Sequence, residues 1–197
     1  MARDRAAQPE AKPLRLFIAV DVPDDVQSAL EAAIAPFRVR VPAARWTRRS
    51  GWHMTLKFLG STWPRLVDEI KSAMAAAATE AAAFRSALTE VGVFANPARS
   101  RVIWVGLADP EKRFAAIARR LDELLEDFYV PEKRELTPHL TLARINPPRD
   151  IREFAPELLD LSVSSREFPV DSLVLYRSHL SPRGATYEAL ERFRLGG

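Results

Sequence analysis

The sequence predicts an α+β fold: a bilobal pseudo-twofold duplication, with mostly antiparallel sheets lining a central cleft and helices packed outside. Three observations support this prediction. The tetrapeptides at residues 53–56 (His-Met-Thr-Leu) and 139–142 (His-Leu-Thr-Leu) share one pattern. Each begins 37 residues after the start of an apolar, β-rich run, at residues 16–20 and 102–106. Helices and strands also mix without the regular alternation of a parallel sheet.

The repeated tetrapeptide is too rare to be an accident of composition. In a chain of this composition, a given His is followed by x-Thr-Leu about once in 220 cases, and this chain has 3 His. Two matches among three His then have a chance under about 1 in 10,000. The repeat therefore indicates two copies of one structural unit.

The first unit reads as strand, turn, helix and strand. The apolar run at residues 16–20 is followed by an acidic turn with a proline at 21–23, and apolar residues then recur at helical spacing over 26–34. Over residues 52–59 apolar and polar side chains alternate, which is typical of a strand with one buried face. The polar parity holds His53, Thr55 and Lys57, and the buried parity holds Met54, Leu56 and Phe58.

The second unit repeats this order. The run at 102–106 is followed by Asp109-Pro110 and by a helical pattern over 114–125. In the second tetrapeptide, His139 and Thr141 share one face, while the two leucines take the other. A symmetric packing of the two units would bring the two histidine strands to opposite sides of one cleft.

The rest of the chain fits around this duplication. Residues 1–13 carry no apolar run and are expected to be a disordered tail, which leaves 14–197 as a single two-lobed domain. Further helices are expected at 63–80 and 151–161, and further strands at 84–94, 170–176 and 187–193.

Composition narrows the class of protein. The absence of Cys excludes disulfides and cysteine nucleophiles and suits a reducing compartment, so a cytoplasmic location is expected. With no signal-peptide pattern and no run of eighteen apolar residues, neither secretion nor a membrane is expected. Of 29 basic residues 24 are Arg, which binds phosphate in a bidentate manner. The cluster Arg38, Arg40, Arg45, Arg48 and Arg49 precedes the first histidine motif and is a candidate contact for a nucleic-acid backbone.

Two imidazoles facing one cleft suit paired general acid and base catalysis near neutral pH. Threonine hydroxyls beside them can donate hydrogen bonds to phosphate oxygens, and an Arg can neutralise developing charge. Phosphodiester hydrolysis needs this set of groups, whereas acyl transfer would need a nucleophile elbow, which the sequence lacks. Two alternatives remain: a phosphate-binding RNA module whose histidines only form hydrogen bonds, and a metal hydrolase. No His-x-His, His-x-x-x-His or adjacent Asp accompanies either motif, so no metal or other cofactor is expected.

At these residues the chain resembles the two-histidine (2H) phosphoesterase superfamily, and within it the RNA 2',3'-cyclic phosphodiesterases, or LigT-like 2'-5' RNA ligases. The similar segments lie at residues 15–20, 53–60, 101–106, 137–144 and 184–187. The resemblance implies a bilobal fold and a metal-independent opening of 2',3'-cyclic phosphate ends to 2'-phosphates. It also implies the reverse reaction, a 2'-5' ligation without ATP, on RNA or nucleotide partners.

The resemblance assigns roles to individual residues. His53 would be the acid that protonates the departing 3'-oxygen and His139 the base that activates water, although the pseudo-symmetry allows the opposite assignment. Thr55 and Thr141 would hold the phosphate. Arg144 matches a basic position of the family, but strict alternation points it away from His139, so it reaches the phosphate only if the strand ends or bulges after Ala143.

Several other residues are weaker candidates. Contacts with a base or the backbone are expected of Phe17, Arg48, Trp52 and Tyr187, although apolar neighbours favour a core position for Phe17. Trp46 is equally ambiguous, and Trp104 is expected to be packed. Lys57 has the parity of His53, although a lone Lys on a strand is more often solvated. His179 lacks a Thr partner and is expected on the surface, and a monomer is the default expectation.

Overall fold

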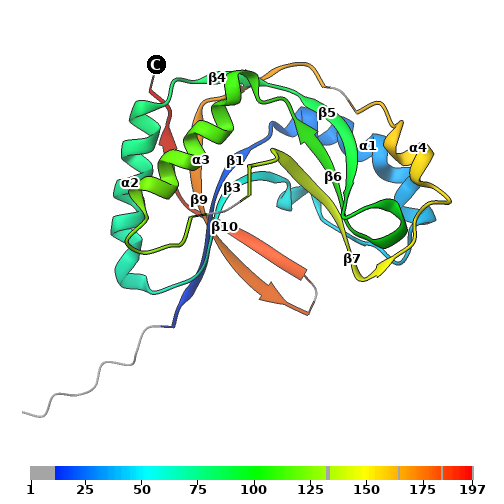
Figure 1. Ribbon diagram of the computed structural model, residues 1–197, viewed down its shortest axis with the longest axis horizontal. Coiled ribbons are helices and arrows are strands. Elements are labelled where there is room, and N and C mark those ends of the chain that lie inside the picture. The colour runs from blue at the N-terminus through cyan, green and yellow to red at the C-terminus, as the bar shows by residue number, and fades with distance from the viewer. Residues whose placement is uncertain (1–11, 132–133, 164, 183, 197) are drawn as a thin grey trace, which may run out of the picture.

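Two four-stranded antiparallel sheets form the centre of the molecule in the computed structural model (Figure 1), which describes residues 12–131, 134–163, 165–182 and 184–196. We call them sheet A, with strand order β10-β9-β1-β3, and sheet B, with order β2-β7-β6-β5. Sheet A consists of β1 (Leu14–Asp21), β3 (His53–Thr62), β9 (Ser172–Ser181) and β10 (Gly184–Arg194). Sheet B consists of β2 (Arg45–Trp46), β5 (Leu88–Phe94), β6 (Ser100–Leu107) and β7 (His139–Arg149).

The remaining elements surround these sheets. The strands β4 (Phe84–Ser86) and β8 (Phe168–Val170) form a separate antiparallel ladder. The helices are α1 (Asp24–Arg40), α2 (Val67–Glu80), α3 (Arg113–Leu124) and α4 (Ala155–Leu159), with short 3-10 turns at Arg49–Gly51, Pro64–Leu66, Pro97–Arg99 and Pro110–Lys112. The predicted α+β class with mostly antiparallel sheets is confirmed. The predicted tail falls on residues 1–11, outside the described part of the chain, and on Lys12 and Pro13, which are exposed.

The internal duplication extends to the strand register. In sheet A, β1 pairs with β3 so that Asp21 lies opposite His53 and Ala19 opposite Thr55. In sheet B, β6 pairs with β7 so that Gly106 lies opposite His139 and Trp104 opposite Thr141. Each histidine is thus the first residue of its strand, and it lies opposite the C-terminal end of the strand that the preceding apolar run forms.

A β-bulge at the same place in both copies changes the faces that the side chains occupy. In β3 the register skips Leu56, and in β7 it skips Leu142, the equivalent leucine. A bulge adds one residue to the strand, so every side chain beyond it points to the face opposite to the one that strict alternation predicts. Phe58 therefore joins the face of His53, and Arg144 joins the face of His139. The alternation predicted over 52–59 holds up to Leu56 and is wrong beyond it.

Lys57 shows the consequence most clearly. It was expected on the polar face, but the bulge turns it to the opposite side, where only 7% of its surface is exposed. Its ammonium group forms an ion pair with Asp122 of α3. Because a buried charge is unfavourable without a partner, this pair fixes α3 against β3.

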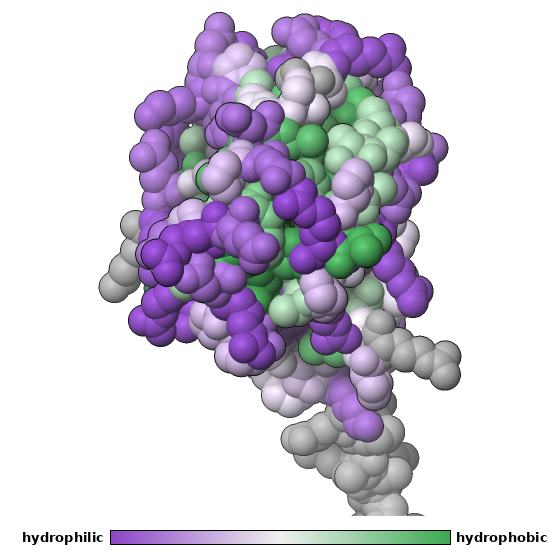
Figure 2. Space-filling view, turned by 90° about the vertical axis from the view of Figure 1, so that its right-hand side faces the viewer, coloured by the Kyte–Doolittle hydropathy of each residue, from purple (hydrophilic) through white to green (hydrophobic). Residues whose placement is uncertain are grey.

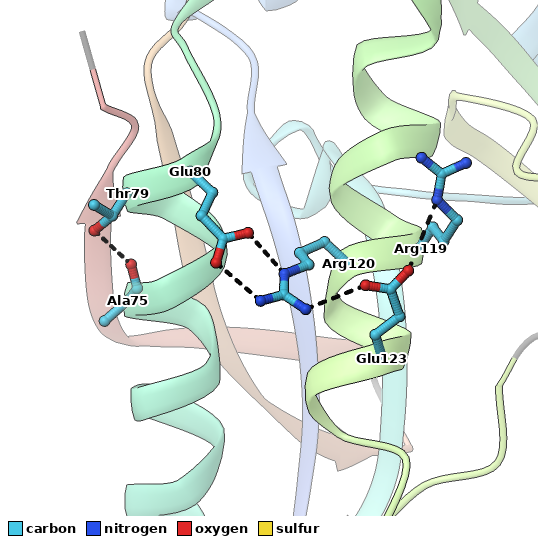
Figure 3. A network of polar contacts seen from close by, with 6 residues as sticks. All are labelled: Ala75, Thr79, Glu80, Arg119, Arg120 and Glu123. Atoms are coloured by element: carbon cyan, nitrogen blue, oxygen red, sulfur yellow. Dashed lines mark hydrogen bonds and ion pairs between the residues drawn. The ribbon is translucent and has the colours of Figure 1, made fainter.

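The helices cover the outer sides of the sheets. α2 and α3 pack together against sheet A, and the ion-pair network of Glu80, Arg120, Glu123 and Arg119 joins their exposed surfaces (Figure 3). α3 begins where the Asp109 carboxylate accepts a hydrogen bond from the backbone N–H of Phe114 (2.8 Å). α4 contacts β5, and an ion pair between Arg40 and Glu157 links α4 to α1. Hydrophilic side chains cover most of the face shown in Figure 2, with apolar ones visible between them.

The order of predicted elements is correct, and the differences lie in their bounds. The strand expected over 84–94 divides into β4 and β5, and 170–176 divides into β8 and β9. The helix expected over 151–161 spans only Ala155–Leu159, and the one over 63–80 begins with a 3-10 turn. A single hydrophobic cluster contains residues of both sheets and all four helices. Within the described residues, no helix is long and apolar enough to span a membrane.

Candidate active site

The His53 imidazole lies in an aromatic environment on sheet A. It stacks on Phe17 with the ring centroids 4.6 Å apart and meets the edge of Tyr187 at 4.9 Å. Tyr176 stacks on Phe17 at 5.3 Å and also lies 5.6 Å from the His53 ring, so the three rings form one cluster. Burial disfavours the charged imidazolium and lowers the pKa of His53 to about 4, although the negative charge of Asp21 acts in the opposite direction.

Asp21 occupies the strand position directly opposite His53 and is held by two partners. The Tyr176 hydroxyl donates a hydrogen bond to Asp21 Oδ1 (2.7 Å), and the Arg192 guanidinium binds Oδ2. Burial and the bond to Asp21 raise the pKa of Tyr176, so the phenol remains a neutral donor. The equivalent position opposite His139 is Gly106, which has no side chain. The pseudo-symmetry is therefore broken by one carboxylate.

His139 has a different environment on sheet B. Its Nδ1 lies 2.7 Å from the Thr137 carbonyl oxygen, which can only accept a hydrogen bond, so Nδ1 carries the proton. In the neutral ring the lone pair is then on Nε2. The ring meets Phe94 edge-on at 5.3 Å and lies near Trp104 at 6.2 Å. Burial lowers the pKa of His139; the Thr137 bond raises it, and the positive charge of Arg144 lowers it further.

The threonines and Arg144 lie beside their histidines. Thr55 and Thr141 are half-buried on the same face as the histidine two residues earlier. Arg144 is exposed. The bulge at Leu142 turns its side chain to the face of His139, as a role beside that histidine requires. The Thr47 hydroxyl contacts the carbonyl oxygens of Thr141 (2.9 Å) and Leu142 (2.8 Å) and so fixes this bulge.

The two histidine strands lie next to one another. β3 and β7 are in contact, and β2, which precedes His53 in the chain, pairs with β7 through Arg45 and Trp46. The chain thus passes from the edge of sheet B to the edge of sheet A within the few residues before His53.

The aromatic candidates separate into buried and accessible ones. Trp52 is 3% exposed and donates its indole N–H to Thr47 Oγ1 (2.8 Å), so it cannot stack on a base, and the prediction of a base contact is wrong. Phe17 is 2% exposed and contributes only by supporting His53. Tyr187 is half-buried above Gly51, where an added Cβ would lie 3.0 Å from its ring, and it remains a candidate contact.

The tryptophans of sheet B are mainly structural. Trp104 is half-buried beside Phe94 and lies directly over Gly92, where a Cβ would meet its ring at 2.1 Å. The lack of a side chain at Gly92 thus allows Trp104 to lie beside His139. Trp46 is half-buried and donates to the Val41 carbonyl oxygen (3.3 Å).

Most of the arginine cluster before His53 is engaged within the protein. Arg38, Arg40 and Arg49 form ion pairs with Glu31, Glu157 and Asp24. Arg45 donates to the carbonyl oxygen of Pro182 (3.2 Å), and Arg48 is exposed. The prediction of a phosphate-binding cluster therefore narrows to Arg45 and Arg48.

The third histidine lies outside this arrangement. His179 is exposed on β9, and its Nε2 lies 2.8 Å from a Glu188 carboxylate oxygen. His179 lies three positions after Tyr176 on β9. Because successive side chains of a strand point to opposite faces, His179 and Tyr176 lie on opposite faces of sheet A. Among the residues that the structure describes, no three His, Cys, Asp or Glu side chains gather as a metal site would need.

Two residues of this site were missed by the sequence reasoning. Asp21 was assigned only to a turn, and the signal that would have found it is its position at the end of the strand that pairs with His53. Phe58 was assigned to the buried face, yet 64% of its surface is exposed. A bulge has no clear signature in the hydrophobic pattern, so no comparable signal existed for Phe58.

Comparisons with known proteins agree with this geometry. Residues 18–182 match the sequence profile of the 2'-5' RNA ligase superfamily. The chain is similar to an RNA 2',3'-cyclic phosphodiesterase of Methanothermobacter thermautotrophicus, with 30% identity over 186 residues that cover 92% of this chain and 99% of that protein. It is also similar to one of Thermus thermophilus, with 34% identity over 197 residues that cover 93% and 91%.

Solved structures show the same fold. The crystal structure of a Thermus thermophilus protein matches with a TM-score of 0.76 at 29% identity and covers 93% of this chain and 99% of that one. Apo LigT of E. coli matches in fold with a TM-score of 0.70 at 22% identity, covering 95% and 100%. The sequence profile includes both His-x-Thr-Leu strands. This chain belongs to the 2'-5' RNA ligase superfamily, the two-histidine phosphoesterases that its repeated motif resembles.

Proposed function

We propose that this protein hydrolyses the 2',3'-cyclic phosphate ends of RNA or nucleotides to 2'-phosphates by paired general acid and base catalysis. The observation that carries the proposal is the pair of equivalent His-x-Thr strands whose histidines have unlike electrostatic neighbours. The names of the relatives at 30% and 34% identity support the choice of substrate. We infer that the two faces look onto one cleft, where a phosphate lies between them.

The environment of His139 suits a general base. With Nδ1–H bound to the Thr137 carbonyl oxygen, the free lone pair on Nε2 can take a proton from water. Burial and the positive charge of Arg144 keep the ring neutral at physiological pH, since both lower its pKa. The hydroxide equivalent that forms would attack the phosphorus atom and expel the 3'-oxygen.

The environment of His53 suits the general acid. In the free protein its pKa is about 4, so a bound anion must raise it before the ring can hold a proton. A phosphodiester beside the imidazole supplies negative charge for this purpose, and Asp21, directly opposite His53 in the strand register, adds to it. The proton then passes to the departing 3'-oxygen, which leaves as a neutral hydroxyl.

The remaining groups would hold and neutralise the phosphate. The hydroxyls of Thr55 and Thr141 would donate to its non-bridging oxygens, and Arg144 would offset the charge that builds on them. The same groups, used in reverse, would join a cyclic phosphate to a 5'-hydroxyl through a 2'-5' linkage. No step of this scheme requires a metal or another cofactor, and one chain, acting as a monomer, carries every group.

Phosphorus NMR of a nucleoside 2',3'-cyclic phosphate tests this proposal. In excess EDTA, the wild type should produce the 2'-phosphate, while His53→Ala and His139→Ala each lose several orders of magnitude in kcat/KM. His179→Ala is the matched control, because this third histidine points to the other face of sheet A, and its activity should equal that of the wild type.

The alternatives give different outcomes. Loss of turnover in EDTA would identify a metal hydrolase and overturn the proposal. Binding of RNA that carries a cyclic phosphate, without turnover and without dependence on either imidazole, would identify a binding module instead. Formation of the 3'-phosphate would reverse the assigned direction of ring opening.

A further inference from the structure

Two arginines lie directly opposite each other at the edge of sheet B. Arg45 of β2 is the register partner of Arg144 of β7, so both side chains project from the same face of the sheet. That face also carries His139 and Thr141, because the bulge in β7 turns Arg144 to their side. Arg45 is therefore a second cation on the face of the active site, one strand further out than Arg144.

This pair of cations is unfavourable unless an anion joins it. Like charges that face each other across two strands destabilise a sheet. Among the described residues, no other ladder position brings two like charges together, and neither arginine forms an ion pair with a carboxylate. On sheet A, by contrast, the partner of Arg177 is the oppositely charged Glu188. The uncompensated charge of sheet B indicates that a ligand supplies the anions.

One contact orients Arg45 without neutralising it. Its Nη2 donates a hydrogen bond to the carbonyl oxygen of Pro182 (3.2 Å), in the turn between β9 and β10. Because a guanidinium has several N–H donors, the remaining ones can bind a phosphate. The bond crosses from the edge of sheet B to the hairpin of sheet A. Arg45 thus lies where the two lobes meet, at the rim of the cleft inferred above.

The charges of an RNA end match this pair of arginines. A cyclic phosphodiester carries a single negative charge, which Arg144 can offset. The positive charge of Arg144 lowers the pKa of His139, so Arg144 acts close to that histidine. The charge of Arg45 is then left for a second anion. In RNA, the nucleotide that carries the cyclic phosphate has another phosphate on its 5'-oxygen, and Arg binds such a group through paired hydrogen bonds.

We propose that Arg45 binds the phosphate on the 5'-oxygen of the nucleotide whose cyclic phosphate is opened. This inference rests on the proposed function and specifies its substrate class. The protein acts on the end of an RNA chain in preference to a free nucleoside 2',3'-cyclic phosphate, and the chain leaves the cleft toward Arg45 and the β9–β10 turn. The preference is independent of sequence, because phosphate contacts carry no base information.

The test compares two substrates that differ only in the second phosphate. One is adenosine 2',3'-cyclic phosphate, and the other is its 5'-methylphosphate, which imitates one backbone linkage. The wild type should have a KM roughly tenfold lower for the methylphosphate, the effect of one charge-assisted hydrogen bond. In Arg45→Gln this difference in KM should disappear, whereas Arg45→Lys, which keeps the charge, should restore most of it. High salt should reduce the difference in the wild type, because the contact is exposed.

Arg149→Gln serves as the control variant. Arg149 is also an exposed arginine of β7, but it lies five positions beyond Arg144, about 16 Å along the strand. Its replacement should leave the difference in KM between the two substrates as in the wild type. Equal losses on both substrates in Arg45→Gln would overturn the inference, because Arg45 would then only support the cleft or bind the same phosphate as Arg144.

Failure of the inference is distinguishable from failure of the proposed function. If the wild type hydrolyses neither substrate, the cyclic phosphodiesterase activity is wrong, and the inference falls with it. If the wild type hydrolyses both substrates with the same KM, the activity stands and Arg45 binds no second phosphate.

Discussion

At the scale of single residues, Asp21 is what makes the two histidines unlike. Both imidazoles are surrounded by aromatic rings and both have their pKa lowered by burial. A neighbouring carboxylate, Asp21, raises the pKa of His53, whereas a neighbouring cation, Arg144, lowers the pKa of His139. Negative charge favours the protonated ring and positive charge the neutral one. The acid and base assignment that the symmetric motifs left open therefore has a physical basis.

The first prediction concerns Asp21→Asn, which removes the charge and keeps the shape. Without the carboxylate the pKa of His53 falls, and the active form with His53 protonated becomes rarer at neutral pH. We expect kcat/KM at pH 7 to fall about tenfold for each unit by which that pKa drops. Tyr176→Phe, which removes a hydrogen bond but keeps the charge, should have the smaller effect. A pH profile of kcat/KM that is identical in Asp21→Asn and wild type would contradict this account.

The second prediction links His53 to acid stability. Its pKa is lowered to about 4 in the folded protein, compared with 6.5 for an ordinary histidine. The unfolded chain therefore binds more protons between these values, and the folded state loses stability as the pH falls from 6.5 to 4. The loss due to His53 is on the order of 3 kcal/mol. Urea unfolding at pH 7.5 and pH 4 should show this extra loss in the wild type and not in His53→Gln; equal losses would refute it.

At the scale of elements, the two bulges decide which residues reach the site. Period-two alternation correctly placed His53, Thr55, His139 and Thr141, because these positions precede the bulges. The same rule misplaced Phe58 and Lys57, which follow one. A bulge depends on how the neighbouring strand and the loop at its end are held, and those contacts join residues far apart in the sequence. Hydrophobic pattern alone could not supply them.

Thr47 offers a test of how the bulge in β7 is held. Its hydroxyl contacts two carbonyl oxygens at the bulge and accepts the indole N–H of buried Trp52. Thr47→Val keeps the shape but removes the acceptor of the Trp52 indole N–H and the hydroxyl at the Thr141 carbonyl oxygen, while the Thr47 backbone N–H still donates to the Leu142 carbonyl oxygen. The change should cost roughly 1–3 kcal/mol in the free energy of unfolding. Because Thr141 and Arg144 are carried by this bulge, kcat/KM should fall as well.

The control for Thr47→Val is Thr79→Val on α2. The Thr79 hydroxyl also donates to a backbone carbonyl, that of Ala75 (2.9 Å), but it lies on the exposed side of the helix (Figure 3). We expect no change of kcat/KM there. If urea unfolding and kinetics of Thr47→Val match the wild type, the hydroxyl does not hold the bulge.

At the scale of the whole molecule, the duplication was the most predictable feature. Two rare tetrapeptides at equal distances from two apolar runs, together with the period of the hydrophobic pattern, were enough to predict the α+β class and the order of elements. The pairing of each histidine strand with its own run was not predicted. The short strand β2, which joins the sheets, was not predicted, because two residues carry no periodic signal. Nor could the sequence show which arginines of the cluster would be paired with carboxylates.

The fourth prediction concerns the ion pair that attaches helix α3 to strand β3. Lys57 and Asp122 form a largely buried ion pair between β3 and α3. Asp122→Ala would leave a buried ammonium group without its partner and should destabilise the protein by about 3–5 kcal/mol. Replacing both residues, Lys57→Met with Asp122→Leu, should restore most of the stability, since no buried charge remains.

The exposed pair between Arg120 and Glu80 is the natural comparison (Figure 3). It also joins two elements, but water screens it, so Arg120→Ala should unfold at nearly the wild-type urea concentration. A large loss of stability in Arg120→Ala together with a small loss in Asp122→Ala would mean that the exposed ion-pair network, rather than the buried pair, holds the helices against the sheet.

The assignment of His53 as the acid and His139 as the base is tested most directly by replacing the 3'-oxygen, the atom that leaves. A nucleoside 2',3'-cyclic phosphate with sulfur in place of the bridging 3'-oxygen expels a thiolate, which needs no proton. Under the proposed assignment of His53 as the acid, His53→Ala should hydrolyse the sulfur substrate within about tenfold of the wild type while it loses several orders of magnitude on the oxygen substrate. His139→Ala should be slow on both. If His139→Ala, and not His53→Ala, hydrolyses the sulfur substrate at nearly the wild-type rate, His139 is the acid and His53 the base. Equal losses of activity on both substrates in both variants would contradict paired acid and base catalysis.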